Sequence, residues 1–136
     1  MRGACPALEP ERKEVSMKKV YIISRYRAKK KRQQEFNIAV AQYFARETVM
    51  EGKLPIVPHI YFTQFLDDSD EDERECGLGL GIHALRHCDE FLLVVIDGII
   101  SEGMRAEIAE ISRLKIPGRI ITLTRKEFIE MVKRSR

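Results

Sequence analysis

Short apolar runs that alternate with segments of helical period constrain the fold of this chain most. Residues 20–23 and 91–96 are continuous runs of β-branched, aromatic and other apolar side chains without helical period, which is typical of buried strands. Residues 119–123 form a similar run near the end of the chain. Because the connections between these runs are long enough to hold helices, the strands are expected to pair in parallel within one α/β sheet.

The spacing of apolar residues predicts helices between these runs. From residue 34 onward, apolar side chains recur at intervals of three and four, and residues 80–88 and 104–115 show shorter stretches of the same kind. Thr124 and Glu127 form the capping pattern that opens a last helix. The order of elements predicts a small doubly wound parallel sheet of about four to five strands, in a Rossmann- or flavodoxin-like three-layer sandwich.

Three further segments do not follow this alternation clearly. Residues 1–17 mix prolines with charges and have no period, so they are expected to be a loose tail before a single domain at 18–136. Residues 54–61 are apolar and β-prone, but two prolines remove backbone donors and favour a short or edge strand. Residues 67–75 carry seven acidic side chains that repel one another, which predicts a solvated loop.

Length and charge limit the class of function. A chain of 136 residues fits one domain, and no apolar run approaches the ~20 residues that span a bilayer. The first twenty residues lack the apolar core of a secretory signal, so a cytoplasmic location is expected, with no membrane partner. The net charge of +3 does not indicate a nucleic-acid partner. The three cysteines have irregular spacing and are expected to be free thiols.

The loop after the first predicted strand is one candidate for a ligand site. Open parallel sheets bind ligands beyond the carboxyl ends of their strands, where helix N-termini favour anions. This loop carries Ser24, Arg25 and Arg27, and the basic residues 29–32 follow it. The positive charge suits a phosphate group. For the lysines of the basic run, a solvated helix face is the favoured alternative, so Arg25 and Arg27 are the better-placed candidates.

The loop at 97–103, after the central apolar run, is the second candidate. The apolar stripe of the helix that follows it, at ~100° per residue, consists of Met104, Ile108, Ile111 and Leu114. Glu107 falls inside this stripe, so its carboxyl group is expected to point inward. A buried carboxylate has a hydrogen-bonding or ionic partner, a raised pKa, or a catalytic or binding role in a cleft. The alternative is an acid that only complements the dipole at the helix start.

Other candidate residues carry weaker signals. His59 follows the second strand segment at the same predicted sheet edge, either as a site residue or as a surface histidine. The closely spaced glycines follow the acidic segment rather than a strand, so they give no dinucleotide-binding fingerprint: Gly77, Gly79 and Gly81. No zinc-ligand spacing is formed by Cys76, His83, His87 and Cys88. No metal and no cofactor are therefore expected.

Several motifs together resemble a known superfamily. They are residues 20–27, Asn37, Pro58-His59, Cys88-Asp89-Glu90 and, most specifically, Ser101-x-Gly103-Met104-x-x-Glu107-Ile108. With these motifs, residues 20–124 resemble the nucleoside 2-deoxyribosyltransferase-like superfamily, especially its small branch in bacteria and phages. The resemblance implies an N-glycosidase or deoxyribosyltransferase that acts on a (deoxy)nucleoside or its 5′-monophosphate. It also implies a homodimer or larger homo-oligomer.

The resemblance also implies a role for individual residues. Glu107 matches the nucleophile that attacks C1′ of the sugar, and Tyr21 matches a phenol that orients it. A carboxylate suits this role because the oxocarbenium-like transition state is stabilised by negative charge nearby. The substrate contacts expected from the resemblance and from the two loops are Ser24, Arg25, Arg27, His59, Asp97, Ser101, Gly103 and Met104. Among them, the arginines match positions that hold a 5′-phosphate, which a guanidinium grips through two hydrogen bonds.

The chain also departs from the superfamily pattern. Ser24 stands where members commonly have glycine, and Gly81 stands where the hydrolases carry an aspartate near the base. Residues 125–136 match none of the pocket residues that relatives supply from a neighbouring subunit. Three hypotheses follow: the enzyme described above, a nucleotide-binding or sensing protein without turnover, and a nucleic-acid adaptor that uses residues 29–32. The acidic segment counts against the adaptor.

Overall fold

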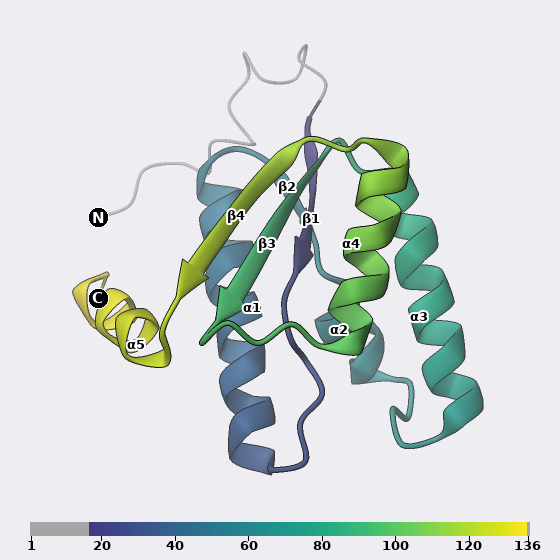
Figure 1. Ribbon diagram of the computed structural model, residues 1–136, viewed down its shortest axis with the longest axis horizontal. Helices are drawn as coiled ribbons and strands as arrows, with labels where there is room; N and C mark the ends of the chain where they lie inside the picture. The colour runs from purple at the N-terminus through teal and green to yellow at the C-terminus, as the bar shows by residue number, and fades with distance from the viewer. Residues whose placement is uncertain (1–16, 136) are drawn as a thin grey trace.

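Four strands form one parallel sheet in the order β2-β1-β3-β4 (Figure 1). The computed structural model describes residues 17–135, so nearly all of the predicted tail at 1–17 lies outside the described residues. The strands are β1 (Lys19–Ile23), β2 (Leu54–Ile56), β3 (Glu90–Ile96) and β4 (Gly118–Leu123). The prediction of a doubly wound parallel α/β sheet is confirmed.

Helices cover both faces of the sheet (Figure 1). One face packs against α1 (Lys31–Met50) and α5 (Arg125–Arg134), and the other against α3 (Glu71–Arg86) and α4 (Glu102–Leu114). The short α2 (Pro58–Tyr61) and the 3₁₀ turn η3 (Phe62–Gln64) connect β2 to α3. The chain moves from β1 to β2 on one side and crosses to β3 on the other. The carboxyl ends of β1 and β3 therefore flank the switch point at which such sheets bind ligands.

Alternating side chains of the two central strands build two separate cores. Toward α1 and α5, the buried residues include Ile22, Val94, Phe44 and Phe128. Toward α3 and α4, they include Tyr21, Ile23, Leu93, Met104 and Ile111. Because successive side chains of a strand point to opposite faces, a strand covered on both sides is apolar throughout. This explains why residues 20–23 and 91–96 lack alternation.

The predicted strand at 54–61 is much shorter in the structure. Only Leu54–Ile56 pairs with β1, and Pro58 then opens the short helix α2. Proline suits a first helical position, where its fixed φ fits and its missing N–H leaves no bond unmade. His59 consequently lies on α2 and not at the end of a strand as predicted.

The prediction of a solvated loop at 67–75 is wrong for its second half, because α3 begins at Glu71. The Asp70 carboxylate accepts hydrogen bonds from the backbone N–H groups of Asp72, at 2.9 Å, and of Glu73, at 3.1 Å. Acidic side chains in a first turn also complement the helix dipole. The acidic cluster therefore starts a helix, and the short helix predicted at 80–88 is the carboxyl-terminal part of α3.

Removing this cap tests why the acidic segment is helical. We expect Asp70→Ala to lower the free energy of unfolding by about 1 kcal/mol, because two backbone donors lose their acceptor. Glu75→Ala, on an exposed position of the same helix, is the matched control and should change it by less than about 0.5 kcal/mol. Urea denaturation of both variants measures the difference. Equal losses would show that the two hydrogen bonds accepted by Asp70 do not stabilise the start of α3.

Candidate functional site

Tyr21 on β1 and Glu107 on α4 meet on the α3/α4 side of the sheet. Tyr21 is 2% exposed, and its phenol donates a hydrogen bond to Oε2 of Glu107. Glu107 lies in the second turn of α4 and is partly buried. The two side chains are 86 positions apart in the chain, and the pairing of β1 with β3 brings them together. The predicted inward orientation of this glutamate corresponds to this contact.

The surroundings of this pair set its protonation. Burial raises the pKa of Glu107 from an ordinary 4.5 to about 7, although the hydrogen bond from Tyr21 opposes the shift. Burial, followed by the negative charge of Glu107, raises the pKa of Tyr21 well above its ordinary range. The phenol therefore stays protonated and remains a donor. Near neutral pH, the carboxyl group of Glu107 is divided between its neutral and ionised forms.

Ser24 and His59 form a second pair at the carboxyl edge of the sheet. Ser24 is buried at the end of β1, and its Oγ lies 3.1 Å from Nε2 of His59 on α2. The ring of Tyr26 meets the imidazole edge-on, with 6.0 Å between the ring centroids. Burial lowers the pKa of His59 to about 4, so the imidazole is neutral at physiological pH. His59 thus supports the Ser24 hydroxyl without adding charge.

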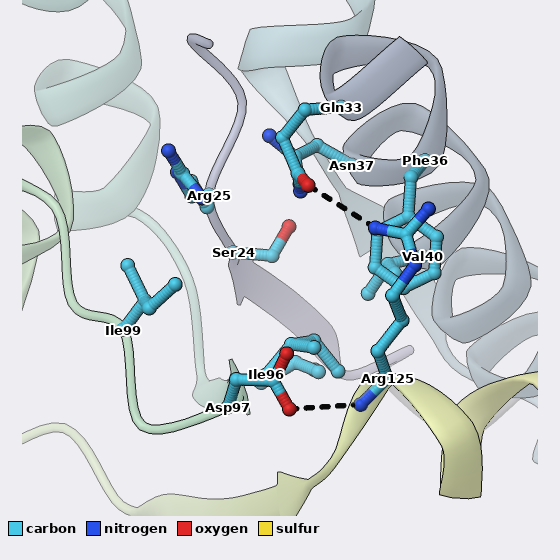
Figure 2. Close-up of a pocket in the computed structure, with 11 residues that line it drawn as sticks. Ser24, Arg25, Gln33, Phe36, Asn37, Val40, Ile96, Asp97, Ile99 and Arg125 are labelled. Atoms are coloured by element: carbon cyan, nitrogen blue, oxygen red, sulfur yellow. Dashed lines mark hydrogen bonds between the residues drawn. The ribbon is translucent and has the colours of Figure 1, made fainter.

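A small cavity of about 40 Å³ opens on the α1/α5 side of the same edge (Figure 2). It is lined by Ser24, Arg25, Gln33, Phe36, Asn37, Val40, Val94, Ile96, Asp97, Ile99 and Arg125. Three of the predicted site residues, Ser24, Arg25 and Asp97, are therefore brought together here. Glu107 is not part of this lining, because it lies on the other face of the sheet. The candidate site consequently has two parts on opposite faces of the sheet, linked through Tyr21 in the middle of β1 and Ser24 directly after it.

Arg125, at the first position of α5, is a cavity residue that the sequence analysis missed. Its guanidinium carbon lies 3.9 Å from the centre of the Phe36 ring, and its Nη1 donates to Oε1 of Gln33 at 3.1 Å. Gln33 in turn donates to Asn37 at 2.8 Å, and Asn37 donates to the backbone oxygen of Tyr26 at 3.0 Å. This chain of hydrogen bonds fixes the loop after β1. The signal for Arg125 was its place directly after the capping residue Thr124, at the carboxyl edge of the sheet.

Asp97 has a structural contact within the cavity wall. Its φ is +55°, which is unusual for a residue other than glycine, and Gly98 follows with a φ of +70°. The tight turn directs Oδ1 of Asp97 to the backbone N–H of Arg125, at 3.0 Å (Figure 2). The carboxylate therefore ties the end of β3 to the start of α5.

The remaining predicted site residues lie away from the cavity lining. Arg27 faces Asp68 in an ion pair at 3.6 Å. Ser101 is the N-cap of α4, where its Oγ accepts from the backbone N–H of Met104 at 3.3 Å. Met104 is 1% exposed and packs in the core, and Gly103 lies in the first turn of the helix. Ser101 and Met104 thus fix the start of the helix that carries Glu107.

No metal or membrane feature is found among residues 17–135. Within this described part, no three His, Cys, Asp or Glu side chains are grouped so that they could hold a metal ion. His83 on α3 and His87, the residue that follows this helix, contact each other, with 4.9 Å between their ring centroids. No helix of the described part has the length and apolar character needed to cross a bilayer.

The fold and the site define a small parallel α/β protein with polar groups gathered at the switch point of its sheet. Residues 18–121 match the family described as Domain of unknown function (DUF7768), so the chain belongs to that family. No curated protein matches the chain. A solved structure of a 2-deoxyribosyltransferase from the psychrotolerant bacterium Bacillus psychrosaccharolyticus is similar in fold, with a TM-score of 0.58 and 14% identity. The likeness covers 76% of this chain and 72% of that chain and establishes the shared fold.

Proposed function

We propose that this protein is an N-glycosidase or deoxyribosyltransferase that cleaves the bond between base and sugar in a (deoxy)nucleoside or its 5′-monophosphate. The observation that carries the proposal is the hydrogen bond from the buried Tyr21 phenol to Glu107. It orients a carboxylate whose pKa of about 7 leaves it ionised in part at neutral pH. The fold shared with a 2-deoxyribosyltransferase supports the same chemistry.

The proposed reaction has two displacements at C1′ of the sugar. An ionised Glu107 oxygen attacks C1′ and forms an ester, while the C1′–N bond breaks and its electron pair leaves with the base. The base takes a proton from water. In the second step, water or another base attacks C1′, the ester bond breaks, and its electrons return to the carboxylate. The attacking water, or the attacking ring nitrogen of the base, releases its proton to the solvent. Negative charge beside the developing oxocarbenium ion lowers both barriers.

The cavity is proposed to hold the 5′ end of the substrate. Its lining contains two guanidinium groups, Arg25 and Arg125, against the single carboxylate of Asp97. Among the described residues, Asp97 already accepts a backbone N–H, and Arg125 is held by a neutral side chain and an aromatic ring. The positive charge of Arg125 is therefore left to interact with a phosphate group. These contacts favour a monophosphate over a free nucleoside.

A panel of substrates tests the proposed reaction. The purified protein is incubated with the common deoxynucleosides, ribonucleosides and their 5′-monophosphates, and the release of free base is followed by chromatography. We expect release from at least one monophosphate. Adding a second free base distinguishes transfer, which yields a new nucleoside, from hydrolysis, which yields the free sugar.

Substitution of Arg125 tests the assignment of the cavity. We expect Arg125→Met to raise the KM for a monophosphate by about tenfold or more, because a charge-assisted hydrogen bond is lost, and to leave the KM for the matching nucleoside unchanged. Lys126→Met, at the next position of α5, which is exposed and does not line the cavity, is the matched control. Arg27→Met should have a smaller effect, since Asp68 already pairs with this arginine. An Arg125→Met enzyme with an unchanged KM would remove the cavity from the substrate site.

Two observations favour a second candidate, a nucleotide-binding or sensing protein without turnover. The cavity that holds the arginines is not lined by Glu107, and Gly81 offers no side chain that could protonate a leaving base. Isothermal titration calorimetry with the same monophosphates distinguishes the two candidates. Binding without any release of base would establish the binding protein.

A further inference from the structure

The residue of α3 that lies against the Tyr21–Glu107 pair is a glycine, Gly81. A Cβ atom added to Gly81 would lie 3.3 Å from the phenol oxygen of Tyr21 and 3.5 Å from Cβ of Pro58 on α2. The first distance is shorter than an ordinary contact between non-bonded heavy atoms. Gly81 itself is buried. A side chain at this position therefore requires α3 or the phenol to move by a few tenths of an ångström.

The phenol has little freedom to move aside. Tyr21 lies on the central strand β1, paired with Ile56 on one side and Phe91 on the other, and is 2% exposed. Its hydroxyl group is already in close contact with the carboxylate of Glu107. Packed interiors resist even small displacements. A methyl group at Gly81 would consequently be accommodated by disturbing the contact between phenol and carboxylate.

We infer that Gly81 is a positioning residue for the Tyr21–Glu107 pair, because the bare backbone of α3 at this point allows the phenol to reach the carboxylate. The catalytic consequence of this inference rests on the proposed function, whereas its geometric basis does not. Gly79, the neighbouring glycine on the same helix, shows that this steric constraint is specific to position 81. A Cβ atom on Gly79 would meet nothing within 4 Å.

The electrostatic surroundings make Glu107 a good reporter of this contact. Pro58 and Gly81 carry no charge, and the ionisable group that acts on the pair from the segment after α3 is Cys88. Burial raises the pKa of this thiol to about 11, so it is neutral near pH 7. The titration of Glu107 therefore depends chiefly on burial and on the hydrogen bond from Tyr21. A longer hydrogen bond and an added methyl group both favour the neutral acid.

The test compares Gly81→Ala with Gly79→Ala. Both substitutions remove a helical glycine and add one methyl group, so both gain the same helix propensity. The titration of Glu107 is followed by NMR of protein labelled with carbon-13 at the glutamate carboxyl, and Glu107→Gln identifies its signal. We expect Gly81→Ala to raise the midpoint by about half a pH unit or more, as a weakened hydrogen bond requires. Gly79→Ala should leave the midpoint unchanged.

Tyr21→Phe completes the experiment, because it removes the atom that the added Cβ would meet. We expect Gly81→Ala to lower the urea midpoint relative to Gly79→Ala in the wild-type background, and this difference to disappear in the Tyr21→Phe background. Equal behaviour of the two alanine variants, in both titration and urea midpoint, would overturn the inference. Neither measurement requires turnover, so a shifted titration in a protein that releases no base would refute the proposed function and leave the inference intact.

Discussion

Glu107→Gln is expected to reduce base release by about 10³-fold or more, because the amide cannot form the ester with C1′. The substitution preserves the volume of the side chain and an oxygen that can accept the hydrogen bond from Tyr21. Glu102→Gln, in the exposed first turn of the same helix, is the matched control and should retain full activity. Initial rates of base release from the best monophosphate of the panel measure the difference. An active Glu107→Gln enzyme would mean that another group carries the reaction.

The same variant is expected to be more stable than the wild type at alkaline pH. Glu107 titrates at about 7 in the folded protein against an ordinary 4.5, so the folded state disfavours the ionised carboxyl. At pH 4, both states hold the neutral acid and the variant gains nothing. As the pH rises from 4.5 to 7, the unfolded chain ionises first, and the wild type loses up to roughly 3 kcal/mol of stability. Urea denaturation at pH 4 and pH 8 should therefore separate the two proteins only at pH 8.

Tyr21→Phe is expected to lower base release at pH 7 by about ten- to a hundredfold. The phenol donates to an ionised group, and such hydrogen bonds contribute about 1.5–3 kcal/mol. Since this bond opposes the burial of Glu107, its loss should raise the pKa of Glu107 further above 7. The nucleophile must be ionised, so wild-type activity should rise as the pH increases through about 7, and the variant should need a higher pH.

A pH profile of kcat/KM from pH 5 to 9 for both proteins measures this shift. Tyr43→Phe, which removes a phenol from α1 on the opposite side of the sheet, is the matched control. A Tyr21→Phe profile that keeps the wild-type midpoint would show that the phenol does not interact with the ionised nucleophile. A loss of activity that is equal at every pH would indicate a role in packing alone.

The parts of the fold that depend on local apolar patterning could be predicted from the sequence. The runs at 20–23 and 91–96 are apolar throughout because helices cover both faces of the sheet, and these are the strands β1 and β3. The inward position of Glu107 followed from the apolar stripe of α4, which needs only the period of a helix. Thr124 likewise begins α5 by accepting from the backbone N–H of Glu127.

The parts that depend on contacts between distant segments could not be predicted in this way. The acidic residues near 70 were predicted to form a loop because their mutual repulsion is visible in the sequence. The hydrogen bonds that the Asp70 carboxylate accepts from two backbone N–H groups are not visible there. In the sequence, Arg125 lay in a segment that matched no pocket residue of the superfamily, and Gly81 stood out only as a departure from the superfamily pattern. Their importance arises from Phe36 and Tyr21, which only the assembled sheet brings against them.

Trapping the sugar on the protein tests the proposed nucleophile most directly. A 2′-deoxy-2′-fluoro-arabinosyl nucleoside monophosphate is suited to this purpose. Its electron-withdrawing fluorine destabilises the oxocarbenium-like transition state and so slows the breakdown of the sugar ester. After acid quenching, mass spectrometry of the intact protein and of its peptides locates any adduct. We expect a mass increase of one fluorinated sugar phosphate on the peptide that contains Glu107, and no increase in Glu107→Gln. Release of base without an adduct, or an adduct on another residue, would contradict the assignment of Glu107 as the nucleophile.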